Sequence, residues 1–162
     1  ADSDADSDAD TDADSDADTD SDTDTDADTD ADSDTDTALY VYNLSLDGTG
    51  YGPHDGATIT AVLKPAVPLS AAPFGMQSLV MDSTGVLHFD WTNVLNDGSA
   101  YIVAWYADVN ANGSCDPAPT DHVWLANVNE GKAGTPQPVT GDQAVVYDHD
   151  TNFAPAPVCT LF

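Results

Sequence analysis

One loop of this sequence carries oxygen-bearing side chains at a spacing that suits a calcium ion. Counting Asp108 as position one, such side chains occupy positions one, three, five and nine, and glycine occupies position six. A hard cation takes about six to eight oxygen ligands, and the glycine permits the sharp bend that turns alternate residues inward. The predicted calcium ligands are Asp108, Asn110, Asn112, Ser114, Asp116 and Asp121.

The end of this loop departs from the EF-hand pattern. Pro119 stands at position twelve in place of a bidentate glutamate, so we expect Asp121 to supply the missing ligand. The segment before Asp108 is a predicted strand, and the loop is similar to the calcium loops of extracellular β-domains. The alternative is a turn rich in Asn and Gly whose side chains hydrogen-bond their own backbone.

The two cysteines are predicted to form a disulfide that ties this loop to the C-terminal part of the chain. Cys115 lies in the loop, and Cys159 lies in the last predicted strand. An even count of cysteines favours one bridge and an oxidising compartment, and hence an extracellular or cell-surface location. The alternative is two unpaired, buried thiols.

The four histidines raise the question of acid–base or zinc chemistry, because each lies within two residues of an aspartate. They are His54, His88, His122 and His149. A pair of histidines at helical spacing, a nucleophile elbow and a CxxC motif are all absent from the sequence. We therefore expect ordinary hydrogen bonds at turns and strand edges for these histidines, and we expect that the protein is not an enzyme.

The elements that position these residues are predicted to be short strands, because the sequence after residue 38 alternates apolar and polar residues between turn signals. The first two strands, at 39–47 and 57–64, are expected to form a hairpin. The remaining predicted strands are 78–82, 86–91, 101–106, 122–127, 143–148 and 157–162. Strands of this number and length indicate an all-β fold, an antiparallel β-sandwich.

One turn in this region resembles a corner found in known domains. The leucine, glycine and tyrosine between Leu95 and Tyr101 are similar to the corner of immunoglobulin-like and transthyretin-like domains. The resemblance implies a sandwich of the Ig-like or transthyretin-like kind. Trp91, Trp105 and Trp124 are expected to pack in the core or at an edge and not to form a platform for sugars.

The first 37 residues repeat a two-residue unit, with aspartate at every even position from 2 to 36. No residue of this tract is apolar and larger than alanine, so we predict two regions, an extended Asp-Ser/Thr/Ala repeat tract at 1–37 and a β-sandwich domain at 38–162. In an extended chain the carboxylates lie on one face and the hydroxyl and methyl groups on the other. Repulsion between the carboxylates opposes compaction of the tract.

The tract resembles two kinds of extracellular structure. Its Asp-Ser dipeptides are similar to the glycosylated serine-aspartate stalks of Gram-positive surface adhesins, and its two-residue period resembles the short-repeat glycofibrils of environmental water samples. Unlike those stalks, the repeat here precedes the folded domain and includes Ala and Thr. Dense hydroxyl groups suit O-glycosylation, whereas bound cations, packing within a polymer or a solvated linker remain alternatives for the tract. The predicted glycan sites are Ser3, Ser7, Thr11, Ser15, Thr19, Ser21, Thr23, Thr25, Thr29, Ser33, Thr35 and Thr37.

The charge of the chain excludes several partners. The formal net charge is −28, with only two lysine or arginine residues, so we expect no nucleic acid and no anionic membrane surface as a partner. No apolar run is long enough to span a membrane, and we expect Ala1 to be a processed or truncated start.

These patterns together predict a structural subunit of a secreted, O-glycosylated fibre or cell-surface appendage, with calcium as its cofactor and copies of itself as partners. Strand addition by 39–46 or 157–162 is one expected way of joining the copies. The alternatives are a stalked adhesin module that binds a glycan or protein ligand, and a calcium-binding matrix protein.

Overall fold

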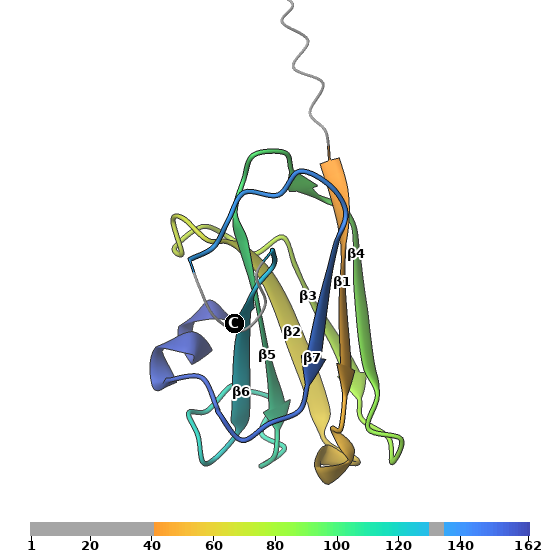
Figure 1. The fold of residues 1–162 in the computed structure, drawn as a ribbon. Helices are drawn as coiled ribbons and strands as arrows, with labels where there is room; N and C mark the ends of the chain where they lie inside the picture. The colour runs from red at the N-terminus through yellow and green to blue at the C-terminus, as the bar shows by residue number, and fades with distance from the viewer. Residues whose placement is uncertain (1–40, 130–134) are drawn as a thin grey trace, which may run out of the picture. The chain divides into compact units, whose positions relative to one another are not determined.

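The computed structural model describes residues 41–129 and 135–162, which form two β-sheets packed against each other (Figure 1). The predicted repeat tract and its glycan sites lie outside these residues. The elements in chain order are β1 (Val41–Thr49), η2 (Gly52–His54), β2 (Thr58–Pro65), β3 (Gly75–Val80), β4 (Leu87–Asn96), β5 (Tyr101–Asp108), β6 (His122–Asn127), β7 (Gln143–Asp148) and η3 (Ala156–Leu161). The predicted all-β fold is confirmed.

One sheet has three strands in the order β4-β1-β7, and the other has four in the order β3-β2-β5-β6. The predicted hairpin of the first two strands is therefore wrong, because β1 and β2 belong to different sheets. The chain between them holds η2 and the fully buried Tyr51, so it crosses from one sheet to the other at the end of the sandwich. The expectation of antiparallel pairing needs one correction, since β1 pairs with β7 in parallel.

The main core lies between the two sheets. Because only one face of a strand such as β4 points into this core, apolar and polar residues alternate along the strand, and this alternation predicted the strands. Leu44 and Leu46 of β1 are buried, and so is Phe89 of β4. His88 and Asp90, which precede and follow Phe89 in the sequence, are exposed. All three tryptophans are buried, with exposed fractions of 4% or less, so the expectation that they pack in the core is confirmed.

A second, smaller core covers the outer face of the four-stranded sheet. All eight residues of β5 are buried, because one face of this strand packs against the other sheet and the opposite face packs under η3. The side chains of this core include Val62, Ile102 and Tyr106 from the sheet and Val158 and Leu161 from η3.

The predicted strand at 157–162 is wrong, because this segment forms the 3-10 helix η3. Pro155 and Pro157 remove two N–H donors that a strand would need for its ladder. In a 3-10 helix, residues three apart lie on the same face, which places Val158 and Leu161 together on the sheet. Of the two segments expected to add to a neighbouring sheet, this one is a helix. In the other, residues 44–46 already pair on both sides within the central strand β1, with β4 and with β7.

Two turns hold the ends of strands in place. The hydroxyl of Tyr101 accepts a hydrogen bond from the Asn96 backbone N–H at 2.8 Å, which closes the corner between β4 and β5. The Tyr51 backbone N–H donates to Gly85 O at 2.9 Å, which joins the segment of η2 to the turn before β4. The second contact positions His54, the last residue of η2.

Candidate metal-binding end of the sandwich

The candidate loop and three of the four histidines lie at one end of the sandwich. β1, β5 and β7 finish at this end and β6 begins there, so η2, the 109–121 loop and the residues after β7 meet (Figure 1). The sequence placed these segments far apart along the chain, and the topology brings them together.

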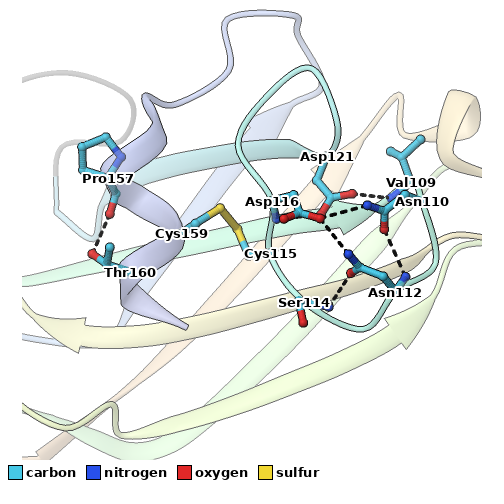
Figure 2. Close-up of a disulfide and its surroundings, with 10 residues drawn as sticks. All are labelled: Val109, Asn110, Asn112, Ser114, Cys115, Asp116, Asp121, Pro157, Cys159 and Thr160. Carbon is cyan, nitrogen blue, oxygen red and sulfur yellow. Dashed lines mark hydrogen bonds between the residues drawn. A yellow bond between two sulfur atoms is a disulfide. The ribbon is translucent and has the colours of Figure 1, made fainter.

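Side chains at the start of the 109–121 loop accept hydrogen bonds from the loop's own backbone (Figure 2). The two carboxylate oxygens of Asp108 accept from the N–H groups of Asn112 at 3.1 Å and Gly113 at 2.8 Å. Asn110 Oδ1 also accepts from Asn112 N–H, and Asn112 Oδ1 accepts from Ser114 N–H at 2.8 Å. Gly113 has a φ of 78°, a left-handed conformation that favours the glycine expected at the bend.

The two remaining aspartates of the loop have different roles. Asp116 Oδ2 accepts hydrogen bonds from the side-chain amides of Asn110 at 2.9 Å and Asn112 at 2.7 Å. Asp121 is fully buried, and its two oxygens accept from the backbone N–H groups of Val109 and Asp116, each at 2.9 Å. Asp121 therefore ties the two ends of the loop together.

All six predicted calcium ligands thus belong to one hydrogen-bonded loop. The side chains of five of them, all except Ser114, hydrogen-bond the loop's backbone or one another. As placed, the described residues contain no group of three or more His, Cys, Asp or Glu side chains that could hold a metal ion. At present the Nδ2 groups of Asn110 and Asn112 face the Asp116 carboxylate. Rotation of each side-chain amide by 180° would place its Oδ1 beside Asp116 instead of its Nδ2. Calcium binding remains a prediction.

The predicted disulfide between Cys115 and Cys159 is present, with a Cα–Cα distance of 5.4 Å (Figure 2). It joins the loop to η3, and not to a strand as the sequence indicated. Because η3 covers the second core, the bridge connects the loop to the packing of the four-stranded sheet.

Three histidines form a cluster that sequence reasoning did not predict. His54 Nε2 lies 3.1 Å from His149 Nε2 and 3.4 Å from His122 Nδ1. His54 ends η2, His122 begins β6, and His149 directly follows β7. The only signal for this cluster in the sequence was that each of these histidines lies at a predicted strand end or turn. The sequence did not show that these strand ends meet, because that depends on how the strands pair.

Aromatic rings surround this cluster. The ring centroid of Trp124 lies 5.5 Å from that of His54 and 5.5 Å from that of His149, and the His122 ring stacks on Phe153 at 4.1 Å. His54 is only 4% exposed. Burial, together with the charges of the other two histidines, lowers the pKa of His54 to about 4. The pKa of His122 is lowered as well, chiefly by burial.

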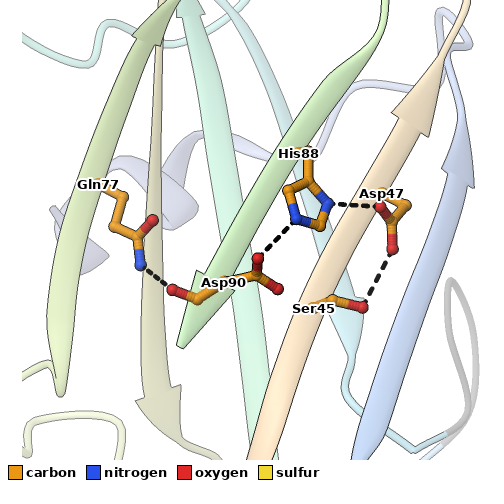
Figure 3. A network of polar contacts seen from close by, with 5 residues as sticks. All are labelled: Ser45, Asp47, Gln77, His88 and Asp90. Carbon is orange, nitrogen blue, oxygen red and sulfur yellow. Dashed lines mark hydrogen bonds and ion pairs between the residues drawn. The ribbon is translucent and has the colours of Figure 1, made fainter. Parts of the chain in front are cut away.

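The fourth histidine lies on the surface of the three-stranded sheet, where it bridges two strands (Figure 3). His88 Nδ1 is 2.6 Å from Asp47 Oδ1, and its Nε2 is 2.6 Å from Asp90 Oδ2. Hydrogen bonds to these two carboxylates, Asp47 first, raise the pKa of His88. The side chain is 55% exposed, so this is the ordinary strand-surface contact that the sequence predicted for histidine.

No protein-family model, no curated protein and no solved structure matches this chain. Within the part of the chain that the structure describes, no helix has the length and apolar character to cross a membrane.

Proposed function

We propose that this chain is a non-enzymatic structural subunit of a secreted fibre or cell-surface appendage. The observation that carries the proposal is the place of β1, the first described strand after the repeat. β1 is hydrogen-bonded on both edges, to β4 in antiparallel register and to β7 in parallel register. A force applied to the residues before Val41 would therefore act against the backbone hydrogen bonds of β1 to both β4 and β7. This arrangement suits a tract that transmits force to a folded module.

The covalent and packing features of the module support the same role. The disulfide is compatible with an extracellular location, and it fixes the loop to η3 over the second core. The described part of the chain is acidic and the 162-residue sequence has a net charge of −28, which favours divalent cations over polyanions as partners. In this proposal the tract is the extended, O-glycosylated part. The proposal also takes the sandwich to be of the Ig-like or transthyretin-like kind.

The test is imaging and sedimentation of the full native chain, with intact mass measured before and after deglycosylation. We expect filaments or large assemblies, and a mass excess over the 16.8 kDa peptide that maps to residues 1–37. A chain that stays monomeric at high concentration in calcium, with the mass of the bare peptide, would refute both the fibre and the glycans.

A stalked adhesin module is the second candidate, and one surface feature favours it. An open hollow of about 340 Å³ lies beside His54, lined also by Asp55, Ala57, Asp108 and Ala111. Its polar lining could accept a small polar ligand or a cation. Binding of soluble glycans or peptides by monomeric protein, lost on substitution of Asp55, would favour this candidate over the fibre.

A further inference from the structure

The histidine cluster has a geometry that hydrogen bonds alone do not satisfy. Each imidazole nitrogen has a single in-plane position, which holds either a proton or a lone pair. Nε2 of His54 faces both His149 Nε2 and His122 Nδ1, so its one position is shared between two partners. At least one of these two contacts is therefore a poor hydrogen bond.

We propose that His54, His122 and His149 together bind a divalent transition-metal ion of the class that prefers imidazole, such as Zn²⁺ or Cu²⁺. A single cation at the junction would accept all three lone pairs and remove the competition for His54. This inference does not depend on the fibre proposal or on the predicted calcium loop, because it uses different residues and a different class of metal.

The distances between the nitrogens fit such an ion. A zinc ion with Zn–N bonds of about 2.0–2.1 Å in tetrahedral geometry holds its nitrogen ligands about 3.3 Å apart. The observed separations from His54 Nε2 are 3.1 Å and 3.4 Å. As placed, the three imidazoles do not point their nitrogens at a common point and so do not form a group that could hold a metal ion. Binding therefore requires the rings to rotate while these two separations are kept.

The surroundings of the cluster favour binding. His54 is only 4% exposed, and its Nε2 lies within 3.4 Å of a nitrogen of each of the other two histidines, so three imidazole nitrogens are close together at a buried position. Trp124 packs against the His54 ring and Phe153 stacks on the His122 ring, which makes the surroundings of the cluster apolar on that side. The strongly negative chain also raises the local concentration of cations.

The class of metal follows from the ligands. Imidazole nitrogen suits Zn²⁺, Cu²⁺, Ni²⁺ and Co²⁺, whereas Ca²⁺ and Mg²⁺ prefer oxygen. Three protein ligands leave a position for water or another group on a four-coordinate ion.

The experiment uses the full chain with Co²⁺ and Zn²⁺ as probes, in excess Ca²⁺ and Mg²⁺ to occupy the many carboxylates. Co²⁺ gives visible bands that distinguish four-coordinate nitrogen ligation from octahedral oxygen ligation, and displacement of Co²⁺ by Zn²⁺ gives the zinc affinity. The test variants are His54→Gln, His122→Gln and His149→Gln. The control is His88→Gln, which removes a histidine that lies outside the cluster and is bound by Asp47 and Asp90.

We expect wild type and His88→Gln to bind one equivalent of Co²⁺ with four-coordinate bands, and each test variant to lose at least about tenfold in zinc affinity. Circular dichroism identifies any variant that fails to fold. His122 and His149 are only partly buried, so their variants decide the question if His54→Gln does not fold. Wild type that binds Co²⁺ only with octahedral bands, or folded cluster variants with the zinc affinity of His88→Gln, would overturn the proposal.

Discussion

The turn that positions His54 depends on a glycine, and replacing that glycine provides a quantitative test of the structure. Gly85 has a φ of 65°, and a Cβ built on it would lie 2.3 Å from Gly52 N and 3.0 Å from Tyr51 N. Gly98 has a similar φ of 72°, but no atom lies within 4 Å of its added Cβ. The variants Gly85→Ala and Gly98→Ala therefore share the backbone cost and differ in the steric cost.

The expected magnitudes follow from these contacts. An L-residue in the left-handed region costs about 1–2 kcal/mol, which is the whole effect expected for Gly98→Ala. At Gly85 the obstructing atoms belong to backbone, which cannot rotate away as a side chain can. Relief requires the segment of η2 to move, which breaks the hydrogen bond from Tyr51 N–H to Gly85 O and adds about 1–2 kcal/mol. Gly85→Ala should thus lose about 3 kcal/mol of unfolding free energy.

The assay is urea denaturation of both variants, followed by tryptophan fluorescence, with the slope against denaturant checked for equality. The buried Trp105 donates to the Tyr51 hydroxyl at 2.9 Å, so the native signal should also change in Gly85→Ala. Equal unfolding free energies for the two variants would show that the turn yields without cost, and the close packing of Gly85 against Gly52 would then be wrong.

Three further predictions concern the disulfide, the loop and the histidine cluster. The double variant Cys115→Ala/Cys159→Ala should lose about 4 kcal/mol of unfolding free energy in urea denaturation, because the bridge closes a loop with a sequence separation of 44; an unchanged midpoint would contradict this. Asp116→Asn should lower calcium affinity in isothermal titration by at least about tenfold, since Asp116 is the carboxylate that the two asparagine amides face; equal affinity would remove Asp116 from the site. In chelator, the unfolding free energy should fall as pH decreases from 6.5 to about 4, because the unfolded chain binds a proton at His54 that the native protein excludes. His54→Gln should show a shallower decrease over that range, and an identical pH dependence would contradict the assignment.

Much of the secondary structure was predictable because alternation is a local property. The strands predicted at 122–127 and 143–148 match β6 and β7 residue for residue. The tryptophans and the disulfide were also predicted correctly, since large aromatic residues and paired cysteines carry strong preferences of their own.

The errors arose where a segment depends on what it packs against. A strand was predicted at 157–162, but Pro155 and Pro157 and the apolar outer face of β5 favour a 3-10 helix. The hairpin of the first two strands failed because Tyr51 occupies the core and carries the chain across to the other sheet.

The sequence by itself was enough to predict an all-β fold, to favour a bridge between Cys115 and Cys159, and to show that acidic and amide side chains share one loop. Only the tertiary structure decided that β1 lies between β4 and β7 and that His54, His122 and His149 meet. The physical reason is the range of the interactions involved. Alternation and turn preferences act over a few residues, whereas the neighbours of a strand end depend on how distant strands pair.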